Sequence, residues 1–259
     1  MKKLISFLIL IIFCLSFTAQ TLKFETLLKD KISIRALQIY NGKVWYSGTD
    51  SKFGFVDLKN LKNKKQIKLS DKNLQFRTLA QDKNYFYAIN LESPAYFFKI
   101  AKKDLKSKIV FKDTLKTAFY DALHFSTNKL AYAFSDSDAS RNLKISVFNN
   151  EKWSALKNDI ILNESEAAFA ASNTNIASSK NYLWIATGGK SSRIIRMNLK
   201  SNNFEVFDTS FIEGTSSTGI YSIDFLDDKF GIAVGGDYTK QSDNLNNIAT
   251  TTDGGETWQ

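Results

Sequence analysis

The 259-residue chain has few of the residues that build cross-links and cofactor sites. It contains one cysteine (Cys14), one histidine (His124) and one proline (Pro94). A single cysteine cannot form an internal disulfide, and one histidine without cysteine partners cannot supply the usual ligand set of a zinc site. We therefore expect no disulfide framework, no metal centre and no bound cofactor.

The first nineteen residues have the pattern of a secretory signal peptide. Lys2 and Lys3 precede the apolar run 4–15, and residues 16–20 are more polar. The uncharged stretch is shorter and more polar than a membrane span of roughly 20 apolar residues. We expect residues 1–19 to be removed and the mature chain, without a transmembrane span or a cysteine, to be secreted to the periplasm or the exterior.

The chain is modestly basic. Lys and Arg number 35 against 26 Asp and Glu, giving a net charge of +9 that falls by two when Lys2 and Lys3 leave. Much of the excess lies in the Lys-rich stretches 59–65 and 102–108, where it favours solubility and blunts strand edges. Attraction to an acidic partner is the functional alternative. Export from the cytoplasm argues against nucleic acid as that partner.

An internal repeat of about 45 residues is the strongest organisational signal. Each copy contains a short apolar strand after a polar turn. These strands begin at Val44, Phe86, Leu130, Leu183 and Phe230. Each has one candidate strand before it and two after it, so one copy has the size and content of a four-stranded propeller blade.

The sequence therefore predicts an all-β fold, a β-propeller over residues 20–259. The strands expected to come first in each unit are 34–37, 76–79, 119–123, 175–177 and 220–223. Residues 167–172 are the only candidate helix, read as an insertion or as a strand with small inward residues. About five blades are present, and we expect one or two more beyond Gln259, with residues 23–28 as a strand of the closing blade.

The last turn carries a specific pattern. Thr251, Asp253, Gly255, Thr257 and Trp258 fill every fixed position of an Asp-box, the hairpin motif of sialidase-like and sortilin-like propellers. We expect Asp253 to accept hydrogen bonds from turn amides, Gly255 to adopt positive φ, and Trp258 to bury its ring. This motif builds a turn and supplies no chemistry.

Three segments, 168–175, 184–193 and 231–238, together with the leader and the Asp-box, give the chain a resemblance to secreted propellers similar to the photosystem II stability and assembly factors. The resemblance implies a propeller that binds a partner, since the photosynthetic members are assembly chaperones for a membrane protein. Many bacterial members carry the label oxidoreductase. No dinucleotide or phosphate-loop motif supports that label here, because 187–191 lacks the required spacing and helix.

Hydrolysis of the sialidase type is an enzymatic alternative. Such a site needs arginines that clamp a carboxylate, with a tyrosine and acids nearby. The candidate catalytic residues occupy matching repeat positions or lie near them: Arg35, Arg77, Asp121, Glu166, Tyr221 and Asp224. Repeat equivalence alone can also place like residues at like sites.

Recognition without catalysis is the function the sequence favours. Propellers present loops and strand ends around a central depression, which basic and aromatic side chains could line. The candidate binding residues are Arg35, Arg77, Tyr120, Arg193, Tyr221 and Lys240. Packing between blades is the structural alternative for each of them. We expect a monomer that binds a protein or glycan, with an acidic ligand favoured.

Overall fold

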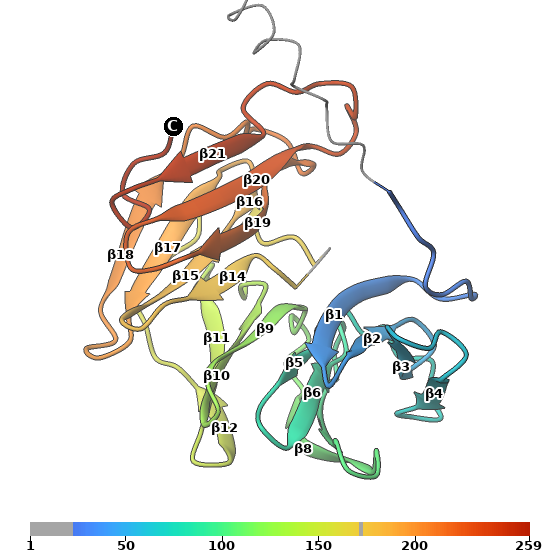
Figure 1. The fold of residues 1–259 in the computed structure, drawn as a ribbon. Helices are drawn as coiled ribbons and strands as arrows, with labels where there is room; N and C mark the ends of the chain where they lie inside the picture. The colour runs from blue at the N-terminus through green and yellow to red at the C-terminus, as the bar shows by residue number, and fades with distance from the viewer. Residues whose placement is uncertain (1–22, 171–172) are drawn as a thin grey trace, which may run out of the picture. The chain divides into compact units, whose positions relative to one another are not determined.

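The computed structural model describes residues 23–170 and 173–259 (Figure 1). The predicted signal peptide therefore lies outside the described residues. The chain divides into residues 1–30 and a compact unit from Lys31 to Gln259. Residues 23–28 form no strand, so the expectation of a blade strand there is wrong.

The unit that starts at Lys31 consists of five antiparallel sheets, here called blades 1 to 5. Blade 1 contains β1 (Ile34–Tyr40), β2 (Lys43–Gly48), β3 (Lys52–Asp57) and β4 (Lys64–Lys68). Blade 2 contains β5 (Ala80–Gln81), β6 (Tyr85–Ile89), β7 (Ala95–Ala101) and β8 (Ser107–Asp113). Blade 3 contains β9 (Tyr120–Thr127), β10 (Leu130–Ser135), β11 (Lys144–Asn149) and β12 (Lys152–Ala155).

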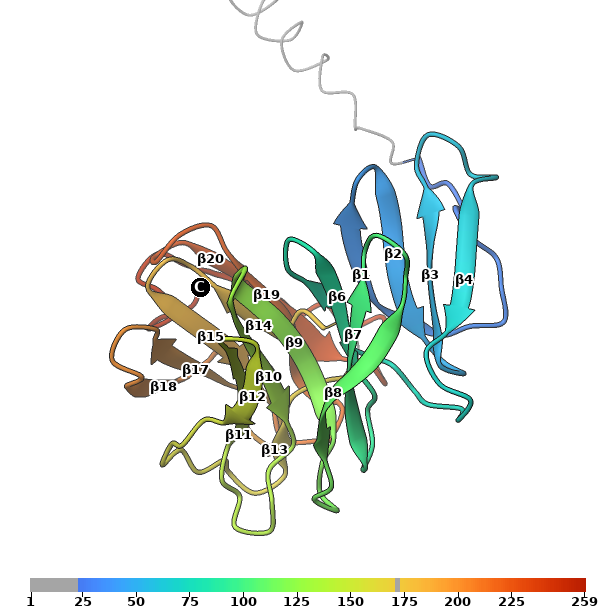
Figure 2. The same ribbon diagram turned by 90° about the horizontal axis from the view of Figure 1, so that it is seen from below.

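Blades 4 and 5 interleave along the chain. Blade 4 contains β14 (Ile176–Ser178), β15 (Tyr182–Ala186), β17 (Arg193–Asn198) and β18 (Phe204–Asp208). Blade 5 contains β13 (Glu166–Ala167), β16 (Gly188–Gly189), β19 (Thr218–Phe225), β20 (Gly231–Asp237) and β21 (Ile248–Thr251). The described residues include no helix, and the five predicted blades are confirmed as a five-bladed β-propeller (Figure 2).

In blades 2, 3 and 4 the second strand sends alternate side chains to the two neighbouring blades, and this packing holds the blades together. In β6, Phe86 and Ala88 belong to the cluster shared with blade 1. Tyr87 and Ile89 belong to the cluster shared with blade 3. All four are at most 1% exposed, so both faces of blade 2 are covered by apolar side chains.

Blade 5 departs from this pattern on one face. In β20 the side chain of Ala233 packs towards blade 4, whereas Ile232 and Val234 on the other face are 42% and 37% exposed. Ile248 of β21, which pairs with Val234, is 65% exposed. Within the described residues, one face of blade 5 is therefore uncovered.

Two local predictions need correction. Residues 76–79 are not a continuous strand, because the hydroxyl of Thr78 accepts the hydrogen bond of the Ile89 backbone N–H and so replaces a backbone partner. Phe76 retains only an isolated bridge to Asn90. In the candidate helix, Ala167 ends the short strand β13, which pairs with Gly188 and Gly189 of β16. Both strands extend blade 5.

The final turn forms as its sequence predicts. One carboxylate oxygen of Asp253 accepts hydrogen bonds from the backbone N–H groups of Glu256 and Thr257, each 3.0 Å. Gly255 has φ of 90°. The ring of Trp258 packs edge-on against Phe225, 6.0 Å between centroids. The local predictions for Asp253 and Gly255 are confirmed, whereas Trp258 is only partly buried.

Candidate functional site

Two predicted arginines meet in one cavity of about 650 Å³ on the channel side of the blades. Arg35 comes from β1, and Arg77 lies just before the short strand β5. Their repeat-equivalent positions explain why they converge. The remaining described lining residues are Phe169, Ala170, Thr174, Tyr221, Ser222 and Tyr238. No carboxylate lies among them.

The positive charge of this cavity is only partly compensated. Arg77 donates a hydrogen bond from Nη1 to the carbonyl oxygen of Ala170, at 3.1 Å. Burial lowers the pKa of Arg77, and the charge of Arg35 lowers it further, which shows that the two guanidinium groups repel one another. The charges of Asp121 and Glu92 raise the pKa of Arg77. Arg35 is exposed and has no ion pair in the described chain.

Three aromatic rings form the opposite wall of the cavity. Phe169 packs edge-on against Tyr221, with centroids 4.7 Å apart, and against Tyr238 at 6.2 Å. The Tyr221 hydroxyl lies 2.6 Å from the carbonyl oxygen of Ser217, which fixes the ring. Sequence analysis missed Phe169 and Tyr238, because neither occupies a repeated strand position. A wall of this kind offers apolar contact beside the two cationic groups.

A second cavity, of about 450 Å³, adjoins the first, since Thr174 and Ser222 line both. The first strands of all five blades contribute to it, so it is the central channel. Its described lining includes Gln38, His124, Ser178 and Asp224. His124 Nε2 lies 2.8 Å from the Ser178 hydroxyl. Burial lowers the pKa of His124 to about 4, against an opposing effect of Asp224, so this imidazole is neutral at pH 7.

The other candidate residues lie outside these two cavities. Tyr120 is fully buried and its hydroxyl bonds to Asp113 and Ser146. Arg193 forms a bidentate ion pair with Glu166, whose side chain is fully buried. Both residues therefore stabilise the fold through this ion pair. Lys240 is exposed, and its Nζ lies 3.9 Å from Oδ2 of Asp237.

Asp121 has a different neighbour from the one a sialidase site would need. Its carboxyl group is fully buried and interacts with that of Asp136, and no N–H or O–H donor of the described chain bonds to either Asp121 oxygen. Burial and the neighbouring Asp136 raise the pKa of Asp121 well above its ordinary value. Burial raises that of Asp136 to about 6. Both acids are therefore harder to ionise than an exposed aspartate.

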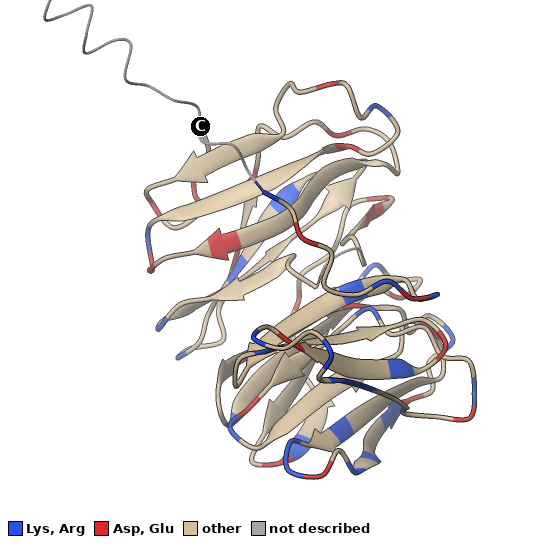
Figure 3. Cartoon of the chain, turned by 45° about the vertical axis from the view of Figure 1, so that its right-hand side comes forward, with Lys and Arg blue, Asp and Glu red and all other residues tan. Residues whose placement is uncertain are grey.

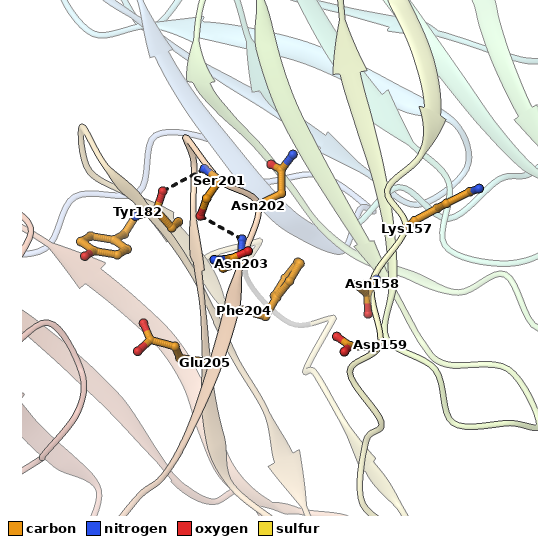
Figure 4. Close-up of a pocket in the computed structure, with 10 residues that line it drawn as sticks. Lys157, Asn158, Asp159, Tyr182, Ser201, Asn202, Asn203, Phe204 and Glu205 are labelled. Atoms are coloured by element: carbon orange, nitrogen blue, oxygen red, sulfur yellow. Dashed lines mark hydrogen bonds between the residues drawn. The ribbon is translucent and has the colours of Figure 1, made fainter.

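A third cavity, of about 830 Å³, lies at the turn between β17 and β18 and is lined mostly by polar side chains (Figure 4). Two of those side chains accept hydrogen bonds from the backbone of the turn itself. Asn198 accepts hydrogen bonds from the backbone N–H groups of Lys200 and Ser201, and Ser201 accepts one from Asn203. Because Asn198 and Ser201 are already engaged in the turn, this surface is a weaker candidate than the channel.

The described residues contain no cluster of three or more metal-ligating side chains. Within residues 23–170 and 173–259, no helix is long and apolar enough to cross a membrane. Charges of both signs are interspersed on the turns, as Figure 3 shows. The excess of lysine therefore does not single out a site, whereas the paired arginines do.

Comparisons with known proteins support the fold. No protein-family model matches the chain, and no curated protein matches it. Among solved structures it is similar to U3-55K, with 13% identity and a TM-score of 0.56 over 80% of this chain and 59% of that chain. It is also similar to the RRP9 WD40 repeats, with 12% identity and a TM-score of 0.57 over 80% of this chain and 58% of that one. The chain thus spans less than two thirds of either structure.

A third similar structure is YCF48 bound to D1 peptide, with 12% identity and a TM-score of 0.55 over 88% of this chain and 82% of that chain. At these identities the likeness shows the fold alone. Together, the five blades and the comparisons define the chain as a β-propeller. The predicted resemblance to photosystem II assembly factors has a structural counterpart in YCF48, and membership of the Asp-box family stays a prediction.

Proposed function

We propose that this protein is a non-catalytic recognition protein that binds an acidic segment of a partner protein. The segment binds in the cavity formed by Arg35, Arg77 and the aromatic wall. The observation that carries the proposal is the pairing of two mutually repelling guanidinium groups with no carboxylate among the described lining residues. A carboxylate ligand relieves that repulsion and can accept bidentate hydrogen bonds.

The aromatic wall explains why the ligand is a protein segment rather than a free ion. Phe169, Tyr221 and Tyr238 supply apolar surface that a peptide backbone and its side chains can cover. Aromatic residues and arginine are enriched at protein-binding surfaces. The similar propeller YCF48 has been solved with a bound D1 peptide, which supports a peptide as the class of ligand.

The arrangement supports binding better than glycoside hydrolysis. Hydrolysis needs two carboxyl groups on either side of the scissile bond. Glu166 is held by Arg193, and Asp121 is fully buried beside Asp136. Asp224 lines the adjoining cavity without a second acid among its described neighbours there.

The test is fluorescence polarisation with a fluorescein-labelled octapeptide containing two adjacent glutamates, and with its twin containing two glutamines. We expect the glutamate peptide to bind and added salt to weaken it. Arg77→Gln should weaken binding about ten-fold or more, the range for a lost charged hydrogen bond. Arg141→Gln is the matched control, because Arg141 is exposed and lines neither cavity.

Two results would contradict the proposal. One is equal affinity for the glutamate and glutamine peptides. The other is binding of an oligogalacturonate to the same arginines with no binding of the peptide, which would replace the protein partner with a glycan. The predicted signal peptide leads us to propose that the encounter takes place outside the cytoplasm.

A further inference from the structure

The central channel has opposite charge at its two connected cavities. The cavity with Arg35 and Arg77 is cationic, and the adjoining one contains Asp224. Asp224 is the only acidic side chain among the described lining residues of that second cavity, and His124, the one basic side chain there, is neutral at pH 7. Thr174 and Ser222 belong to both cavities, so a single ligand can reach both.

The amide groups of the second cavity are occupied by the fold. Gln38 donates to the carbonyl oxygen of Leu79, and its own oxygen accepts a hydrogen bond from Gln81. Asn173 donates to the carbonyl oxygens of Leu79 and Leu123. These bonds join inner strands, so the amides are parts of the wall rather than groups that await a ligand.

Asp224 is the exception. One of its oxygens accepts a hydrogen bond from the backbone N–H of Phe225, at 2.9 Å. Neither oxygen has an ion pair or a further hydrogen bond in the described chain, and the residue is exposed. Ile223 and Phe225 on either side are buried against blade 4, so Asp224 lies on the opposite face of β19, the face on which its pair partner Ile232 is exposed. A carboxylate held in this way is complemented by a cation.

We propose that the second cavity is a subsite for the cationic side chain of a lysine or arginine, so that the channel recognises a segment carrying both an acidic and a basic residue. This inference rests on the proposed function and adds the sign and place of a second contact. The neutral His124 and the Ser178 hydroxyl beside Asp224 supply polar surface without a competing positive charge.

The experiment uses the glutamate octapeptide with one lysine placed two, four or six residues from the glutamates, and matched peptides with norleucine in place of lysine. Binding is measured for the parent protein, for Asp224→Asn and for the control Asp71→Asn, an exposed acid that lines neither cavity. At one spacing we expect the lysine peptide to bind about five-fold more tightly than its norleucine twin, the size of a partly exposed ion pair.

Asp224→Asn should abolish that preference, so that the lysine and norleucine peptides bind this variant equally, whereas Asp71→Asn should keep the preference. Lysine and norleucine peptides that bind the parent equally at all three spacings would overturn the subsite and leave the arginine cavity standing. A preference that survives Asp224→Asn would also overturn it. Failure of every glutamate peptide to bind would overturn both proposals.

Discussion

The indole Nε1 of Trp184 donates a hydrogen bond of 2.8 Å to the carbonyl oxygen of Gly254. Trp184 is fully buried in blade 4, and Gly254 belongs to the final turn. Arg196 donates to the same oxygen at 3.1 Å. This carbonyl therefore fastens the last turn to blade 4, which gives the Asp-box-like turn a structural role.

Asp253→Ala should lower the free energy of unfolding by about 1–3 kcal/mol, because four donors lose their acceptor. Burial alone would raise the pKa of Asp253, but hydrogen bonds from Thr257, Thr251 and Glu256 outweigh it and lower the pKa to about 2. The stabilisation is therefore present above pH 4 and is lost as the pH falls towards 2. Urea unfolding followed by tryptophan fluorescence measures it, with Asp71→Ala as the control. Equal stability of the two variants would contradict this role.

The uncovered face of blade 5 leads to a second prediction, which concerns the free energy of unfolding. Ile89→Ala, at a position 1% exposed between two blades, should cost about 2–5 kcal/mol. Ile232→Ala, the same change on the open face of β20, should cost less than about 1 kcal/mol. Urea unfolding of both variants gives the comparison. Similar losses at the two positions would mean that something covers Ile232 in solution.

The buried acids Asp121 and Asp136 predict an unusual dependence of stability on pH. Their raised pKa values mean that the folded chain keeps a proton that the unfolded chain releases above about pH 4. The favourable contribution of Asp136 is full below pH 4 and is lost as the pH rises through about 6. Asp136→Asn should therefore gain stability relative to the parent between pH 4 and pH 7, by about 2 kcal/mol.

The measurement is the free energy of unfolding of the parent, Asp136→Asn and the control Asp243→Asn at pH 4.5 and 7.5. Asp243 is an exposed residue. A constant difference between Asp136→Asn and the parent at the two pH values would contradict the raised pKa of Asp136, whatever the sign of that difference.

The repeat made the architecture predictable, because apolar strands at intervals of about 45 residues report a blade without reference to the site. Arg35 and Arg77 could be paired in advance for the same reason, as both stand at the first strand of a unit. Tyr120, at an analogous position, turned inwards to Asp113 instead. The repeat predicts where a residue lies in a blade. It does not predict the direction of the side chain where a bulge shifts the strand register, as it does between Phe134 and Ser135, the residue that pairs with Tyr120.

The rest of the site could not be predicted, because it comes from residues outside the repeat. Phe169 lies in the connection before blade 4, and Tyr238 follows the last residue of β20. The pairing of Asp121 with Asp136 depends on how two strands of blade 3 end, and neither residue carries a motif. The exposure of one face of β20 could not be predicted either, because its apolar side chains resemble those of the buried second strands.

The most direct test of the arginine cavity is an NMR titration of the arginine side chains. The chain has five arginines, Arg35, Arg77, Arg141, Arg193 and Arg196, so their Nε–Hε signals can be assigned by substitution. On addition of the glutamate octapeptide, the signals of Arg35 and Arg77 should shift, and those of Arg141, Arg193 and Arg196 should remain in place. Shifts confined to the last three, or no shift at Arg35 and Arg77 when the peptide is bound, would contradict the account.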